Sequence, residues 1–236
     1  MTKAIAMTLM LGLLTLAAAD ASEALQQKML AHARTVTGNE YAFTRTARTQ
    51  QSGGDGPKER VMVERFDPSK PAETRWTLVN VDGRAPTAEE LKSHAKEAPK
   101  RPVGLYARVA NYVGAPATAA TDARGRTVFR FATLPKNSLL VSNVDLSANS
   151  SAEAVVDASG ATPFVQQVRF RLLKPTRMKV VAKIETFEAQ TSYRLQPDGI
   201  PLPAEQSSEM TGSLMGKEGK IRTTISYADF RRVGVR

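Results

Sequence analysis

Histidine and cysteine, two residues often used for catalysis near neutral pH, are scarce in this chain. It contains only His32 and His94 and no cysteine, so a thiolate nucleophile and a cysteine-based metal site are excluded. Both histidines fall on predicted helices, and His32 shares an apolar helical face with Met29. We therefore expect a packed histidine at position 32 and not a catalytic base.

Common catalytic and metal-binding motifs are missing as well. The chain has no HExxH pair and no GxSxG elbow. The glycines and lysines of GSLMGKEGK (212–220) indicate a hairpin turn and not a phosphate-binding loop. Two carboxylate pairs, Glu64 with Asp67 and Glu89 with Glu90, are expected on exposed turns or in the first turn of a helix, where acids stabilise the helix dipole. The sequence predicts a protein that is not an enzyme and holds no cofactor and no metal. An enzyme with two acids converging in one pocket stays open as an alternative.

The first 21 residues have the composition of a secretory signal. Lys3 precedes an uncharged apolar run from Ala4 to Ala19, and Ala-Asp-Ala (19–21) matches a cleavage site. The run has about 16 residues, whereas a spanning helix needs ~20. Cleavage before Ser22 is therefore favoured over a membrane anchor. An exported chain without cysteine is typical of the bacterial envelope, so we expect a periplasmic location.

The chain is basic, with 33 lysines and arginines, 23 acids and a net charge of +10. In an exported protein, this positive charge favours an anionic membrane surface over nucleic acid as a partner. We expect a basic surface on two neighbouring strands, formed by Arg169, Arg171, Lys174, Arg177, Lys179 and Lys183. The alternative is a solvated face whose charges discourage edge-to-edge pairing of strands. Nothing in the sequence indicates an oligomeric state.

Three helical segments are predicted. The first is 22–36, with one apolar face formed by Leu25, Met29, His32 and Val36. The second starts at Thr87, which with Glu90 forms a capping box, and runs to about Glu97. A third amphipathic segment follows, with one face formed by Leu105, Val109, Tyr112 and Val113.

In the rest of the chain, above all from residue 126 onward, apolar and polar residues alternate as in β-strands, with turn residues between the segments. In the long segment 176–195 the apolar positions change phase between Ile184 and Phe187, which predicts a bulge that curves the sheet. The fold class is α+β, mainly antiparallel β. We expect a strongly curved, unclosed β-barrel (half-barrel) with an N-terminal helix and two inserted short helices, in a single domain over 22–236.

This order of elements resembles the periplasmic lipoprotein-carrier and receptor fold of the LolA/LolB type. That fold is an unclosed β-barrel whose helices cover the mouth of an apolar cavity. In addition, FDPSKPAETRWTLVNVDGRAPTAEEL (66–91), GIPLP (199–203) and SYADFRRV (226–233) resemble a group of uncharacterised proteobacterial envelope proteins near this fold. The resemblance implies a lipid or an acylated protein as partner. The family's functional residues follow no sharp motif, so it assigns no individual residue.

Together these observations predict a periplasmic, non-catalytic protein that binds an apolar ligand, the acyl part of a lipid or lipoprotein, in the concave face of the sheet. Each candidate lining residue also suits a plain core position. The candidates are Trp76, Leu78, Leu91, Leu105, Val109, Phe129, Phe131, Met178, Val180 and Ile184. The alternative is an envelope scaffold or sensor that binds a protein partner with the same fold, which a fully packed sheet interior would favour.

Overall fold

The computed structural model describes residues 21–36, 40–53, 56–100, 103, 106–141, 144–179 and 182–234. The expected signal segment lies outside the described residues apart from Ala21, and so do Leu105 and Val180. Within the described part of the chain, no helix has both the length and the apolar composition needed to cross a membrane.

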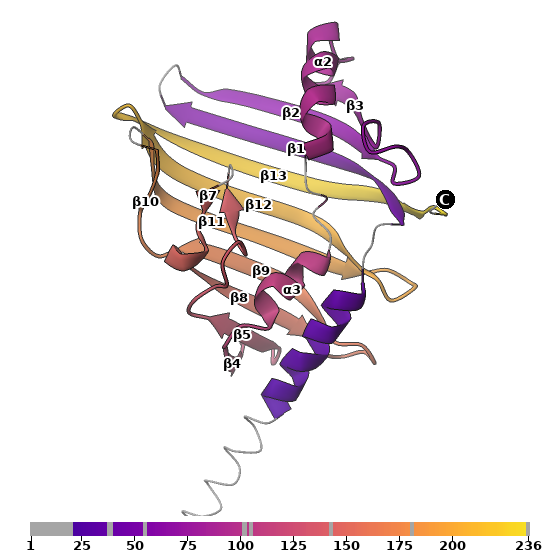
Figure 1. Ribbon diagram of the computed structural model, residues 1–236, viewed down its shortest axis with the longest axis vertical. Helices are drawn as coiled ribbons and strands as arrows, with labels where there is room; N and C mark the ends of the chain where they lie inside the picture. The colour runs from indigo at the N-terminus through magenta and orange to yellow at the C-terminus, as the bar shows by residue number, and fades with distance from the viewer. Residues whose placement is uncertain are drawn as a thin grey trace, which may run out of the picture.

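Eleven strands form one antiparallel sheet, which confirms the predicted mainly antiparallel α+β fold. The strands follow the order β3-β2-β1-β13-β12-β11-β9-β8-β5-β4, and β10 pairs with β11. The sheet is curved and its edge strands β3 and β4 do not pair, so the barrel stays unclosed (Figure 1). The strands are β1 (Tyr41–Gly53), β2 (Lys58–Phe66), β3 (Trp76–Val81), β4 (Thr118–Thr121), β5 (Thr127–Phe131), β8 (Ser150–Asp157), β9 (Phe164–Leu172), β10 (Thr176–Lys179), β11 (Ala182–Leu195), β12 (Pro201–Leu214) and β13 (Lys217–Arg232). A separate small hairpin consists of β6 (Leu140–Val141) and β7 (Val144–Asp145).

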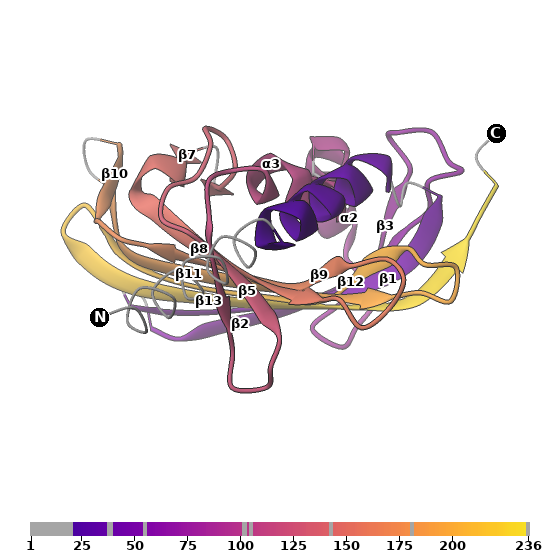
Figure 2. The same cartoon turned by 90° about the horizontal axis from the view of Figure 1, so that it is seen from below.

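The N-terminal helix (21–35) and the inserted helices lie on the concave face of the sheet, as Figure 2 shows. The predicted apolar face of the N-terminal helix is confirmed, since Met29 and Val36 are buried. The two predicted insertions are present as α2 and as a short η2–α3 pair. The helical segments after the first are α2 (Ala88–Glu97), η1 (Ala98–Lys100), η2 (Tyr106–Val109), α3 (Ala110–Val113) and η3 (Ser147–Asn149).

Two apolar clusters hold these layers together. The larger joins the N-terminal helix and the η2–α3 pair to β5, β8, β9 and β11, and includes Met29, Val109, Phe129, Phe131 and Ile184. The smaller lies at the opposite end of the strand order, where Phe43, Phe66 and Trp76 form an aromatic group beside Ala98. The ring centroids of Phe43 and Phe66 lie 5.0 Å apart, and those of Phe66 and Trp76 lie 4.9 Å apart. The central strands β12 and β13 thus run between two separately packed regions.

The segment 176–195 is not the single strand that its alternation predicts. Its first part forms β10, which turns back and pairs with the start of β11, so that Thr176 lies opposite Ile184. The sequence did not predict this division into two strands, because the segment 176–195 contains no glycine, proline or asparagine. The predicted bulge is confirmed: the pairing of β11 with β12 shifts between Ile184 and Thr186, and both Ile184 and Phe187 are buried.

The corner between β3 and α2 contains a tight turn and the predicted capping box. Asp82 and Gly83 have φ values of 52° and 82°, the left-handed pair of a tight two-residue turn. The backbone N–H of Glu90 donates to Thr87 Oγ1 at 3.2 Å, and the backbone N–H of Thr87 donates to Glu90 Oε2 at 2.8 Å. This reciprocal capping box fixes the start of α2 above the β1–β2 side of the sheet.

Candidate functional site

An apolar pocket of about 540 Å³ lies on the concave face where the ends of β1, β10 and β12 come together. We call it the tip pocket. Its apolar lining consists of Met178, Ile184, Met210 and Ile221. Ile184 is buried, and Met178 and Met210 pack against the larger core while remaining partly exposed. The tip pocket therefore presents a flexible apolar floor, since methionine adapts to ligands of irregular shape.

A second pocket of about 480 Å³, the central pocket, lies further along the same strands, beside α3 and the β6–β7 hairpin. Phe170, Phe187 and Tyr193 form its aromatic side, and Gln206 and Thr223 contribute polar groups. Burial raises the pKa of the Tyr193 hydroxyl, so this group stays neutral at physiological pH. The lining is thus mainly uncharged, with apolar and hydrogen-bonding side chains next to each other.

The tip pocket and the central pocket follow one another along the central strands. Phe187 of β11 pairs with Met210 of β12, which pairs with Ile221 of β13, and this rung lies where the two pockets adjoin. Two residues further along, Ser208 pairs with Thr223 in the central pocket. Successive rungs on one face are about 6.6–6.8 Å apart. We call the two pockets together the groove; each volume falls in the range of ~300–1,000 Å³ usual for small-molecule sites.

A row of glycines forms the floor of the tip pocket beyond this rung. Gly53 of β1 pairs with Gly219 of β13, Gly219 pairs with Gly212 of β12, and Gly212 pairs with Ile184 of β11. A Cβ atom on Gly212 would lie 2.3 Å from the carbonyl oxygen of Lys183, closer than any real contact. The neighbouring backbone approaches closely here, and at the level of the glycine row three adjacent strands contribute no side chain to the pocket.

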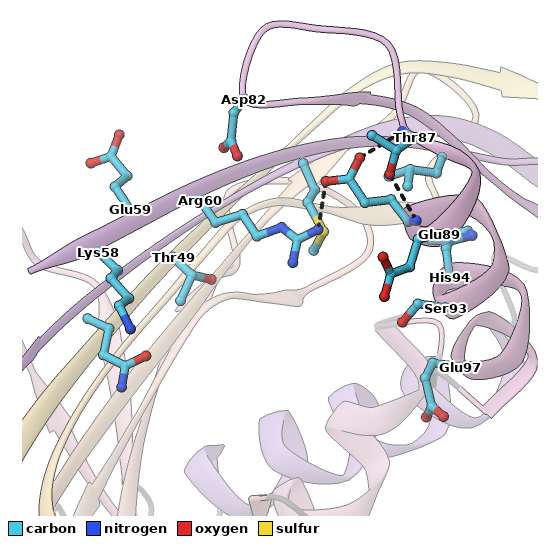
Figure 3. Close-up of a pocket in the computed structure, with 14 residues that line it drawn as sticks. Thr49, Lys58, Glu59, Arg60, Asp82, Thr87, Glu89, Ser93, His94 and Glu97 are labelled. Atoms are coloured by element: carbon cyan, nitrogen blue, oxygen red, sulfur yellow. Dashed lines mark hydrogen bonds and ion pairs between the residues drawn. The ribbon is translucent and has the colours of Figure 1, made fainter. Parts of the chain in front are cut away.

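A different kind of pocket lies between α2 and strands β1 and β2. This α2 pocket has a volume of about 910 Å³, and its acidic lining residues are Glu59, Asp82, Glu89, Glu90 and Glu97. Figure 3 shows Glu89, Ser93 and Glu97 along the helix, with Lys58 and Arg60 on the strand across the pocket. Glu90 accepts from Arg84 at 2.9 Å and contacts Arg60 at 3.3 Å. The α2 pocket is larger than either pocket of the groove. Its charged walls nevertheless suit water or polar groups and not an acyl chain.

A buried ionic cluster lies behind the α2 pocket. Glu64 is fully buried and accepts from Arg45 Nε at 3.0 Å, while the His94 Nε2 atom lies 2.8 Å from its other carboxylate oxygen. The guanidinium of Arg45 lies 4.6 Å from the centre of the Trp76 ring. The cluster joins β1, β2 and α2, so its arrangement is that of a structural tie between helix and sheet.

Glu64 corrects one prediction. It was expected on an exposed turn together with Asp67, but it occupies an inward position of β2, in phase with Met62 and Phe66. The period of two along RVMVERF indicates that Glu64 faces inward. An acid between two inward apolar residues must be paired to be buried. His94 was expected on a helix and is there; its burial against Glu64 was not predicted. No group of three metal-capable side chains occurs among the described residues.

The structure divides the predicted lining residues among several places. Met178 and Ile184 line the tip pocket, and Leu78 is buried at the α2 pocket. Trp76 belongs to the smaller apolar cluster, whereas Leu91 is exposed on α2. Three further candidates are core residues of the larger cluster: Val109, Phe129 and Phe131. The groove residues that the sequence did not single out include Met210, Ile221 and Thr223 of β12 and β13.

The predicted basic surface is partly neutralised by acids. Arg171 donates to Glu188 at 2.8 Å, and Lys183 lies 2.7 Å from Glu185. Arg169 donates to Gln190 at 3.0 Å. Arg169 and Arg171 alternate with buried residues of β9, so they lie on the convex face. The other members of the predicted surface are Lys174, Arg177 and Lys179, in or near β10. The ion pair of Arg171 with Glu188 between β9 and β11, and that of Lys183 with Glu185 within β11, thus interrupt the expected continuous stripe.

Several solved structures resemble this fold over most of its length. One is a DUF1329 family protein from Desulfovibrio piger, with 12% identity, a TM-score of 0.38 and coverage of 91% of this chain and 94% of that one. A LolA superfamily protein from Nitrosomonas europaea has 9% identity, a TM-score of 0.36 and the same coverages. An outer membrane lipoprotein-sorting protein domain from Vibrio parahaemolyticus has 12% identity, a TM-score of 0.35 and coverages of 87% and 91%.

The names of these structures agree with the LolA/LolB-type resemblance expected from the sequence. The identities and TM-scores describe a distant likeness. No protein-family model matches the sequence, and no curated protein matches it.

Proposed function

We propose that this chain is a non-catalytic periplasmic protein that holds the acyl part of a lipid or lipoprotein in the groove. The observation that carries the proposal is an unfilled groove with an apolar floor between two packed apolar clusters. The N-terminal helix and the η2–α3 pair fill the concave face over β5, β8 and β9. The inward side chains of β12 and β13 stay partly exposed, as the burial of Met210, Ile221 and Thr223 shows.

The energetics of the groove fit a releasable ligand. Each buried methylene contributes about 0.8 kcal/mol, so ten methylenes contribute about 8 kcal/mol, equivalent to roughly micromolar affinity. The ordering of a flexible chain reduces this value. Such binding needs no reactive side chain, which is consistent with a proposed role without catalysis. The groove also argues against the scaffold alternative, which a fully packed interior would favour.

Two neighbouring threonines provide a matched test. Thr223 faces the central pocket, and Thr224 does not line the groove and takes the opposite face of β13 by the period of the strand. Thr223→Phe places a ring in the groove, so we expect at least about a tenfold loss of affinity for a fluorescent acyl probe, about 1.4 kcal/mol. Thr224→Phe should bind the probe like the unaltered chain.

The measurement is a probe titration of delipidated protein, with circular dichroism of both variants to establish that they are folded. If the unaltered protein shows no saturable uptake of the acyl probe, the proposal is wrong. Equal loss in both folded variants would also count against it, because the effect would then not arise from occupancy of the groove.

A further inference from the structure

The charged residues around the groove are mostly basic. Of the residues that line the tip pocket, four are lysines and one is an acid: Lys58, Lys183, Lys217, Lys220 and Glu218. The central pocket has one charged lining residue, Arg108, and it is also basic. The α2 pocket has the opposite balance, with five acids and two basic residues. The apolar groove thus lies within a positive local field, and the neighbouring polar pocket within a negative one.

The lysines of the tip pocket differ in how far they are already paired. Lys183 lies 2.7 Å from Glu185, and Lys220 lies 2.7 Å from Glu209. Lys217 forms no ion pair with any described residue and its side chain is exposed. Pairing with acids reduces what Lys183 and Lys220 offer a ligand, so Lys217 is the lysine best able to take a new anionic partner.

The position of Lys217 is set by the β12–β13 hairpin. Met215 and Gly216 have φ values of 51° and 77°, the two left-handed positions of a tight turn. Lys217 pairs with Leu214 directly after this turn. By the period of the strand it projects to the same face as Gly219 and Ile221, which is the concave face. Lys58 of β2 lies across Gln51 of β1 and lines both the tip pocket and the α2 pocket.

We propose that the ligand of the groove is an anionic amphiphile, with its acyl chain over Met210 and Ile221 and its carboxylate or phosphate at Lys217 and Lys58. This inference rests on the proposed acyl-binding function and adds the charge of the ligand and its direction. The glycine row leaves room for the chain to pass between Lys217 and the apolar rung. Lys58 lies level with that rung, because it pairs with Gln51 and Gln51 pairs with Ile221. A zwitterionic or cationic head gains less from a lining with five basic residues and one acid.

The test compares single-chain lipids that share one acyl chain. Lysophosphatidic acid and palmitic acid are anionic, and lysophosphatidylcholine is zwitterionic; each displaces a bound neutral acyl probe below its micelle concentration. We expect the two anionic lipids to displace the probe at concentrations on the order of tenfold lower, as two partly exposed charge contacts allow. The preference should shrink between 50 mM and 500 mM salt because salt screens exposed charges.

Charge-matched variants locate the effect. Lys58→Gln/Lys217→Gln should lose the preference for anionic lipids and keep the affinity for lysophosphatidylcholine. The control Lys92→Gln/Lys174→Gln removes the same charge from exposed residues that do not line the groove, and it should keep the preference.

The outcomes separate the inference from the function on which it rests. If all three lipids displace the probe equally, the groove binds acyl chains and the inference is overturned. If the control variant loses the preference as well, the effect comes from net charge and the inference is again overturned. Failure of the unaltered protein to bind any acyl probe would remove the proposed function itself. Tighter binding of the phosphate or of the carboxylate lipid identifies the head group, and either order supports the inference.

Discussion

The groove and the α2 pocket lie on the same concave face of one sheet, yet they are suited to different contents. The groove is floored by Phe187, Met210 and Ile221, whereas the α2 pocket is lined mainly by charged and polar groups. The difference arises from the covering element: α2 turns a polar face with Glu89, Ser93 and Glu97 toward its strands (Figure 3). A concave sheet therefore does not define a ligand by its shape alone, and the α2 pocket, although larger than either pocket of the groove, is not the better acyl site.

The largest expected effect is the loss of stability when the ionic cluster behind the α2 pocket is broken. No corresponding cluster supports the groove among the residues that line it. Glu64→Ala leaves the partly buried Arg45 and the buried His94 without their carboxylate, which should lower the free energy of unfolding by about 3–5 kcal/mol. Glu59→Ala removes an exposed partner of Arg48, at 3.2 Å, and should cost at most about 1 kcal/mol. Urea denaturation followed by circular dichroism measures both. A loss near 1 kcal/mol for Glu64→Ala would show that the cluster does not tie α2 to the sheet.

A smaller effect tests whether α2 influences the groove. Thr87→Ala removes the side-chain half of the capping box and should destabilise the protein by about 1 kcal/mol. Since Thr87 lines the α2 pocket and not the groove, acyl-probe affinity should stay within about twofold of the unaltered value. A much weaker affinity in this variant would mean that the two regions are coupled, and the contrast between them would have to be revised.

The smallest effect concerns the acid that closes the capping box. Hydrogen bonds from Arg84 and from the Thr87 backbone lower the pKa of Glu90 to about 2, from an ordinary value of 4.5. A lowered pKa means that the charged form is favoured in the folded state, so the stabilisation is present above about pH 4.5 and is lost as the pH falls toward 2. The difference in urea midpoint between the unaltered chain and Glu90→Gln should therefore shrink over this interval. A constant difference from pH 6 to pH 2.5 would contradict this role of the Glu90 charge.

Local signals in the sequence predicted local structure well. The capping box at Thr87 and Glu90 and the bulge after Ile184 each depend on residues a few positions apart, so periodicity and spacing reveal them. The division of the segment 176–195 into β10 and β11 was not predicted, because the segment contains no glycine, proline or asparagine. The cluster of Arg45, Glu64 and His94 joins positions 19 and 30 residues apart, and only the inward phase of Glu64 pointed to it.

The candidate site was predictable only in part, for a related reason. Alternation identifies which residues of a strand face inward, but it does not identify what covers them. Phe129 and Met178 have the same kind of pattern, yet Phe129 is covered in the larger core and Met178 lines the tip pocket. The groove depends on where the N-terminal helix and the η2–α3 pair end above the sheet. That is a property of tertiary packing, which a single strand segment does not encode.

The glycine row has a consequence for the dynamics of the sheet. Cross-strand side-chain contacts contribute much of the cohesion between neighbouring strands, and Gly53, Gly219 and Gly212 contribute none at this level. Residues 213–218 of the β12–β13 hairpin, which lie beyond the row, are joined to the rest of the sheet chiefly through backbone hydrogen bonds. Their amide protons should exchange with solvent by local opening at a lower free energy than those of the sheet interior. The glycine row would therefore let the end of the groove that carries Lys217 open and re-form while both apolar clusters stay intact.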